Sequence, residues 1–188
     1  MTENSLPAGS TSPAGPLQPS GLTDLVGAQL DSLGGETGLL ARLVRLAGEH
    51  AAAGQLPFTG AVVRDGAVIG VGANLALARS DPSSHGEVEA IRDAGRRAGL
   101  AALAGTSVYS SCEPCAICRT VAAAAGAREI VFAAGRELVP TELDLDPETT
   151  GRLMDAVGEL LPGIARPAAS GLSDAELAEP FRLFLDAR

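Results

Sequence analysis

Hydrophobic and polar residues follow helical and strand-like patterns in turn along this chain. Residues 38–54 place apolar side chains three and four positions apart, which predicts an amphipathic helix. His50 lies near the end of that helix and is interpreted as a surface residue. Residues 22–33 are more weakly helical. The apolar face of the first helix consists of Leu39, Leu40, Leu43, Leu46 and Ala47.

Two short apolar runs flank Asp65-Gly66, a dipeptide typical of tight hairpin turns, so residues 58–72 are predicted to form a β-hairpin. Later segments alternate between the two types of element. The resulting order predicts a mixed sheet covered by helices, an α/β fold of about five strands. Further strands are expected at 106–111 and 128–134, and further helices at 86–99, 115–126, 145–161 and 173–186.

The composition indicates one domain that is not embedded in a membrane. A chain of 188 residues can bury a substantial core, and no apolar run approaches the length of a membrane-spanning helix. Residues 1–20 are rich in Ser, Pro, Gly and Thr, which predicts a disordered tail before a single domain at 21–188. The start also lacks the pattern of a secretory signal, so we expect a cytoplasmic protein.

Charge argues against a nucleic-acid partner. The formal net charge is −9, and all 14 basic residues are arginine. Arg92, Arg96 and Arg97 form the only local basic cluster in the sequence, but Asp93 lies among them, so this cluster is interpreted as a solvated helix face.

All three cysteines lie within the stretch SSCEPCAICRT. An odd number of cysteines fits poorly with a disulfide framework, and haem attachment would need histidine where Arg119 stands. A redox pair formed by Cys115 and Cys118 remains possible. A structural zinc site usually needs four protein ligands, and the chain offers only two histidines, His50 and His85.

A catalytic zinc site needs only three protein ligands and leaves a fourth position for water. Cys115 and Cys118 can approach one ion from the first turn of a helix, and His85 opens another helix and can supply the third ligand. Glu87 follows two residues later and can face the same cavity as an acid–base group. Cys112 is interpreted as a small buried hydrophobe rather than a ligand.

His85-Gly86-Glu87, followed by Pro114-Cys115 thirty residues after His85 and by Cys118, matches the H-x-E…P-C-x-x-C signature of the zinc deaminases. The chain therefore resembles the cytidine deaminase-like superfamily from about residue 57 to residue 134. The resemblance implies a three-layer α-β-α fold, one zinc ion per chain, a homodimer, and hydrolytic deamination with Glu87 as the proton shuttle.

The motif sequences PFTGAVV, DPSSHGEVEAIR and SSCEPCAIC most resemble those of bacterial guanine deaminases. This resemblance implies that Asn74 hydrogen-bonds the substrate ring, that the Gly86 N–H meets the ring carbonyl, and that Phe58 flanks the base. It also implies an acidic residue that selects the purine, for which Glu137 and Glu142 are the candidates. Three residues depart from the pattern: Thr59, Gly86 and Arg119.

Guanine is thus the first candidate substrate. Cytosine or cytidine-type compounds and aminotriazines or pterins are the alternatives, and tRNA adenosine is disfavoured by the acidic charge. A zinc-binding module without catalysis is also possible, although the presence of Glu87 argues against it. Segment 135–188 diverges from the guanine deaminase pattern. Its last helix has an apolar face, Leu177, Phe181 and Phe184, that could cover a pocket, meet a partner or fold back on its own core.

Overall fold

The computed structural model describes residues 18–188. The predicted tail lies almost wholly outside the described residues. Five strands form one sheet in the order β2-β1-β3-β4-β5, with β2, β1 and β3 antiparallel and β3, β4 and β5 parallel. The predicted mixed sheet is therefore confirmed. The strands are β1 Thr59–Arg64, β2 Ala67–Ala73, β3 Ser107–Cys112, β4 Glu129–Ala134 and β5 Ala165–Pro167.

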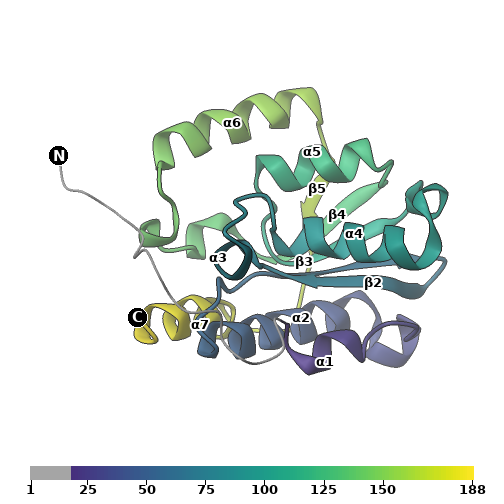
Figure 1. Ribbon diagram of the computed structural model, residues 1–188, viewed down its shortest axis with the longest axis horizontal. Helices are drawn as coiled ribbons and strands as arrows, with labels where there is room; N and C mark the ends of the chain where they lie inside the picture. Colours follow the sequence, from purple (N-terminus) through teal and green to yellow (C-terminus); the bar gives the residue numbers. More distant parts are fainter. Residues whose placement is uncertain (1–17) are drawn as a thin grey trace.

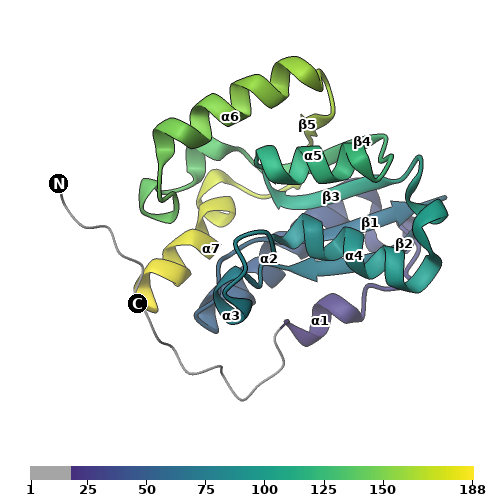
Figure 2. The ribbon, with the colours of Figure 1, turned by 45° about the horizontal axis from the view of Figure 1, so that its top comes forward.

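Helices cover both faces of this sheet (Figure 1). Helices α1, α2 and α7 lie on one face, and α4 and α5 lie on the other, with α6 outside α5 (Figure 2). This arrangement is the expected three-layer α-β-α fold. The helices are α1 Ser20–Thr23, α2 Gly35–Ala52, α3 Ala76–Arg79, α4 Gly86–Ala98, α5 Ala116–Ala124, α6 Pro147–Leu160 and α7 Asp174–Asp186, with 3-10 turns at Asp31–Leu33, Leu100–Leu103, Arg136–Leu138 and Thr141–Leu143.

The predicted hairpin is present. Asp65 and Gly66 both have positive φ values, 49° and 80°, as the favoured two-residue hairpin turn requires. The β2 strand then passes directly beneath α4. A Cβ atom at Gly72 would lie 2.3 Å from the backbone nitrogen of Ala90, so the absence of a side chain there allows the helix to sit close to the sheet. Helix α4 begins at the end of this contact and places the predicted His85 ligand beside β1 and β2.

Helix α7 folds back on its own chain. Leu177, Phe181 and Phe184 are all buried, and α7 packs along α2 (Figure 2). The capping box at Ser173 and Glu176 fixes the start of this helix, as the sequence predicts. Three roles were considered for its apolar face, and the structure shows the last of them, packing against the core of its own chain. This face is therefore closed to a partner subunit.

His50 is not at the surface, and the interpretation as a surface residue was wrong. The side chain is 2 % exposed, and Nε2 lies 2.7 Å from the carbonyl oxygen of Asn74. The physical reason is the helical period, because position 50 follows Leu43, Leu46 and Ala47 by seven, four and three residues and so shares their buried face. A hydrogen bond to a backbone carbonyl compensates the buried ring.

No helix between residues 18 and 188 is long and apolar enough to cross a membrane.

Candidate active site

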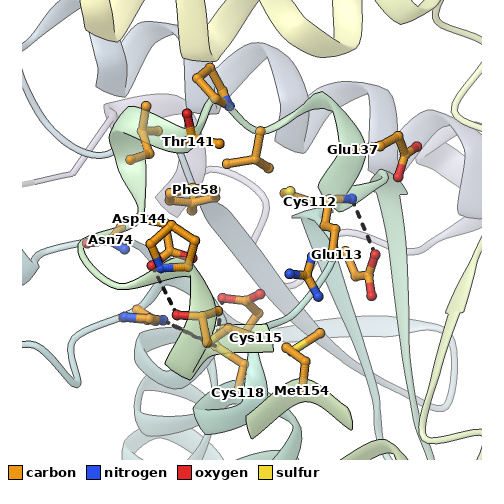
Figure 3. A pocket seen from close by; sticks show the side chains of 18 residues that line it. Phe58, Asn74, Cys112, Glu113, Cys115, Cys118, Glu137, Thr141, Asp144 and Met154 are labelled. Carbon is orange, nitrogen blue, oxygen red and sulfur yellow. Dashed lines mark hydrogen bonds between the residues drawn. The ribbon is translucent and has the colours of Figure 1, made fainter. Parts of the chain in front are cut away.

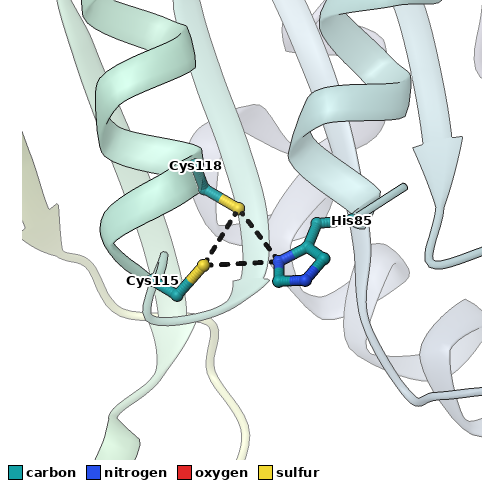
Figure 4. A group of neighbouring side chains, drawn as sticks. All are labelled: His85, Cys115 and Cys118. Carbon is teal, nitrogen blue, oxygen red and sulfur yellow. Dashed lines mark hydrogen bonds between the residues drawn. The ribbon is translucent and has the colours of Figure 1, made fainter. Parts of the chain in front are cut away.

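Three side chains converge where α4 and α5 begin (Figure 4). His85 is the N-cap residue of α4, Cys115 is the N-cap residue of α5, and Cys118 follows in the first turn of α5. The His85 Nδ1 atom lies 3.3 Å from the sulfur of Cys115 and 3.5 Å from that of Cys118, and the two sulfurs are 3.6 Å apart. The predicted arrangement at two helix starts is therefore present.

This spacing fits zinc. Bond lengths near 2.3 Å to sulfur and 2.0–2.1 Å to nitrogen, at tetrahedral angles, place ligand atoms about 3.5–3.8 Å apart. Two thiol sulfurs and one imidazole nitrogen are also the donor types that zinc prefers. Three protein ligands are also the number found in catalytic zinc sites, which keep a fourth position for water. The structure thus brings together His85, Cys115 and Cys118 in a geometry that could hold a zinc ion.

Contact between the two thiols shifts their pKa values in opposite directions. The sulfurs of Cys115 and Cys118 are in hydrogen-bond contact, and that contact, with help from His85, lowers the pKa of Cys115 to about 4. The same contact and burial raise the pKa of Cys118. The surroundings of Cys115 therefore favour its thiolate, and metal binding requires that Cys118 loses its proton as well.

Glu87 lies beside the trio on the first turn of α4, with 5 % of its surface exposed. Its Oε1 atom accepts a hydrogen bond of 2.9 Å from the Ser110 hydroxyl, and Oε2 lies 3.3 Å from the Cys118 sulfur. Burial, with the negative charge of the Cys115 thiolate, raises the pKa of the Glu87 carboxyl. One carboxylate oxygen is thus anchored to β3, while the other faces the ligands.

A cavity of about 500 Å³ opens in front of these residues (Figure 3). Its inner wall comes from the motif region, and its outer wall comes from the divergent segment that follows β4. Of the two predicted purine-selecting residues, Glu137 lines the cavity and Glu142 does not. Asp144, which was not predicted, also lines the cavity. The lining residues of the outer wall are Arg136, Glu137, Val139, Pro140, Thr141, Leu143, Asp144, Pro147, Thr150 and Met154.

Two of the three predicted substrate contacts are at this cavity. Phe58 and Asn74 line it, and the Phe58 ring packs against Phe181 of α7 with centroids 5.8 Å apart. The cavity walls described between residues 18 and 188 do not include Gly86. As the first residue of α4, Gly86 nevertheless has a backbone N–H without an acceptor within its own helix.

Gly86 also accounts for one departure from the guanine deaminase pattern. A Cβ atom there would lie 2.8 Å from the Phe58 carbonyl oxygen and 3.0 Å from the Thr59 Cα. Thr59 cannot easily retreat, because its N–H donates to the Ser111 hydroxyl and its own hydroxyl donates to the Leu43 carbonyl. Because the backbone at Thr59 is held in this position, only glycine fits without crowding at position 86, and the two departures are structurally linked.

The variant Gly86→Ala is expected to lower the free energy of unfolding by about 1–3 kcal/mol through overcrowding. Thr59→Gly in the same chain should recover part of that loss, because glycine frees the start of β1 to move. Urea unfolding of the two single variants and the double variant measures the coupling. Strictly additive losses would contradict the pairing.

Arg119 is the other departure, and it braces the turn that carries the cysteines. Its Nε donates to the Pro114 carbonyl at 3.0 Å, and Nη2 donates to the Glu113 carboxylate at 2.6 Å. Glu113 also accepts from the backbone N–H of Arg136, at the start of the outer cavity wall. These contacts connect the segment before Cys115 to both α5 and the divergent segment.

Replacing Arg119 with methionine is expected to weaken zinc binding by about tenfold, the lower end of effects seen for residues that orient metal ligands. Competition with a chromogenic chelator measures the affinity. Arg128→Met is the matched control, because Arg128 pairs with Glu129 at the start of β4 and its side chain is 69 % exposed. Equal affinities in the two variants would contradict the bracing role.

Sequence reasoning missed several residues that support this site. Ser110 holds Glu87, and the signal for it was a serine within the predicted strand that leads to the cysteine motif. Asp81 accepts hydrogen bonds from the hydroxyls of Ser83 and Ser84 and so orders the turn before His85. His50 was missed because the apolar face of the helix was taken to end at Ala47, although the helical period places position 50 on the same face.

A mixed five-stranded sheet with His and Cys ligands at two helix starts, and a carboxylate between them, defines a deaminase-type zinc centre. The chain belongs to the cytidine and deoxycytidylate deaminase zinc-binding family, whose profile matches residues 37–134.

Relatives in this family act on different substrates. The chain is 44 % identical over 80 residues to a guanine deaminase of Bacillus subtilis, covering 42 % of this chain and 51 % of that protein. It is 33 % identical over 93 residues to a tRNA-specific adenosine deaminase of Haemophilus influenzae, covering 48 % and 53 %. The chain thus spans about half the length of the curated relatives it matches.

A solved guanine deaminase from Nitrosomonas europaea superposes with a TM-score of 0.59 over 96 % of this chain and 99 % of that one, at 18 % identity. This likeness supports the fold and carries no conclusion about the substrate.

Proposed function

We propose that this protein is a zinc-dependent hydrolytic deaminase of a free aminated heterocycle. The observation that carries the proposal is the Glu87 carboxylate, which is buried beside the His85–Cys115–Cys118 trio and faces a cavity large enough for a small heterocycle. A structural zinc site has no use for such a group. The redox alternative is weaker, because a redox pair does not need His85 in contact with both sulfurs.

When bound, zinc supplies a water that is a nucleophile near neutral pH. Glu87 would take a proton from the attacking water at Oε2 and deliver it to the substrate ring nitrogen, and would then move the second proton of that water to the departing amino group. Ser110 keeps Oε1 occupied, which leaves Oε2 as the atom that moves the proton. The overall reaction replaces the exocyclic C–N bond with a C–O bond and releases ammonia.

Asn74 and Phe58 hold the substrate. The Oδ1 atom of Asn74 accepts a hydrogen bond from the Ala76 N–H, so the side-chain NH₂ group is the one that faces a ligand and donates. Phe58 offers an aromatic wall for a planar ring. The Gly86 N–H serves as a further donor at the start of α4 in this proposal.

Guanine is the first candidate substrate, because the motif sequences and the 44 % identity to the Bacillus subtilis protein both favour guanine deaminases. Glu137 and Asp144 are the carboxylates of the outer wall that can accept from the amino and ring N–H groups of a purine. A cytosine-type base and an aminotriazine or pterin are the alternatives, since each presents a similar amidine edge.

The charge of the cavity disfavours tRNA, which is the substrate class of several other relatives. Four carboxylates line the cavity, Glu87, Glu113, Glu137 and Asp144, against one arginine, Arg136. A polyanion would meet repulsion here and over a chain of net charge −9. A neutral base needs only an apolar slot with a few placed polar groups.

An ammonia-release assay of the zinc-loaded protein tests the proposal. The panel consists of guanine, adenine, cytosine, their nucleosides, an aminotriazine, a pterin and a tRNA. Turnover of guanine above the others is expected. Turnover of cytosine or a nucleoside alone would refute the guanine assignment, and no turnover in a protein with one zinc per chain would favour the non-catalytic module.

We further propose a homodimer, as the resemblance implies. Since α7 packs on its own chain, the partner must contact another surface. Light scattering at micromolar concentration tests this assembly, and a monomer mass would remove it.

A further inference from the structure

His50 is a buried histidine that the proposed chemistry does not use. It lies in the last turn of α2, on the opposite face of the sheet from the zinc ligands of α4 and α5 (Figure 1). A carbonyl oxygen can only accept, so the 2.7 Å contact with Asn74 requires that Nε2 carries the proton and donates. Burial lowers the pKa of His50, which favours the neutral ring, and the hydrogen bond to the carbonyl selects this tautomer.

The loop after β2 is held at three points around Asn74. Its backbone N–H donates to the Phe58 carbonyl at 2.8 Å, its carbonyl accepts from His50, and its side-chain Oδ1 accepts from the Ala76 N–H. Across the described part of the chain, His50 is the sole hydrogen-bond donor to that carbonyl. Without it, a buried carbonyl would be left unpaired, and the peptide that joins Asn74 to Leu75 would be held only through its N–H.

The same loop continues to the metal site. The N–H of Leu75 donates to the Ser84 carbonyl at 2.8 Å, and Ser84 directly precedes His85. A hydrogen-bonded path therefore runs from His50 through the 74–75 backbone to the residue before the zinc ligand. Phe58, which flanks the cavity, is joined to the same path through its carbonyl.

We propose that His50 is a positioning residue of this active site, which fixes the peptide of Asn74 so that the Asn74 side-chain NH₂ group is aimed into the cavity. The inference rests on the proposed function for its effect on substrate binding, but the positioning itself does not. Because His50 touches neither the cavity nor the metal ligands, its loss weakens substrate binding and leaves the proton transfer by Glu87 in place.

The test compares His50→Met with His50→Gln. Methionine fills the space with a flexible apolar chain, whereas glutamine restores an N–H donor. We expect KM to rise about tenfold in His50→Met with kcat little changed, zinc at one per chain, and a KM close to that of the parent in His50→Gln. His50→Leu is made in parallel as a second apolar variant.

Thr106→Val is the matched control. It removes a buried hydroxyl that donates to the Leu103 carbonyl at 2.7 Å, before the start of β3 and away from the cavity. It should lower the melting temperature with no change in KM. If the apolar His50 variants lower the melting temperature with KM unchanged, as Thr106→Val does, His50 is merely structural and the proposal is overturned.

Hydrogen exchange separates this proposal from the proposed function. Amides of residues 74–76 should exchange at least about tenfold faster in His50→Met than in the parent, and should stay unchanged in Thr106→Val. A protein that deaminates nothing would refute the proposed function, and this measurement would still decide the positioning role. ¹⁵N shifts of the parent provide a check without any variant: an Nδ1–H tautomer of His50 would overturn the proposal.

Discussion

Glu87→Gln is expected to lower kcat for deamination by about 10²–10⁴-fold, the range that a positioned acid–base group supplies. Glutamine has nearly the same shape and can still accept from the Ser110 hydroxyl, so the fold of the site should persist. What it cannot do is take a proton and give it back. Steady-state assays with metal analysis measure the effect, and zinc should remain at about one per chain.

Glu89→Gln is the matched control for that variant. Glu89 lies two residues further along α4 and is 1 % exposed, but its carboxylate accepts from Arg79 and Arg92 instead of facing the cavity. The change should cost stability, because two charge-assisted hydrogen bonds are weakened, and leave kcat within about threefold. Full activity in Glu87→Gln, or equal losses of activity in the two variants, would remove the proton-shuttle assignment.

The candidate ligand trio could be predicted because each part of it is a short motif at the start of a helix. Cys115 and Cys118 are three residues apart at a helix start, and His85 opens another helix, so the helical period and the preference for helix N-termini do most of the positioning. The same holds for the hairpin, where Asp65-Gly66 fixes the turn. The cysteine pair and the hairpin turn depend on a few neighbouring residues, whereas the approach of His85 to the cysteines was predicted from the spacing of the two-part motif.

Features that depend on distant contacts were harder to predict. Strand β5 has only three residues, one of them Pro167, and it forms because its backbone pairs in parallel with β4 at the edge of the sheet. Arg166 in that strand also binds Glu36 and Glu129, at 2.9 and 2.8 Å. No period or propensity in so short a segment indicates a strand.

The divergent segment after β4 has two separate roles, and its sequence alone did not decide between the alternatives considered for it. Residues 136–154 form the outer wall of the cavity, where they meet the substrate in the proposed reaction, while α7 crosses to the other face and packs on α2. Phe181 of α7 still reaches the site indirectly, through its ring contact with Phe58. Substitutions in this segment can therefore alter substrate choice without touching the metal ligands.

Removal of one zinc ligand should abolish both metal binding and activity. Cys118→Ser is expected to reduce zinc after dialysis from about one per chain to near zero, because a hydroxyl replaces a thiolate that the ion prefers. The melting temperature should fall as well, since a ligand present at about 1,000 times its dissociation constant stabilises a fold by roughly 4 kcal/mol. A chelator should lower the melting temperature of the parent and leave that of Cys118→Ser unchanged.

Cys112→Ala is the control: Cys112 is buried beside the cavity but lies outside the ligand trio, so this variant should keep its zinc. A zinc-loaded Cys118→Ser protein, or loss of zinc in Cys112→Ala, would show that the ligand set is wrong.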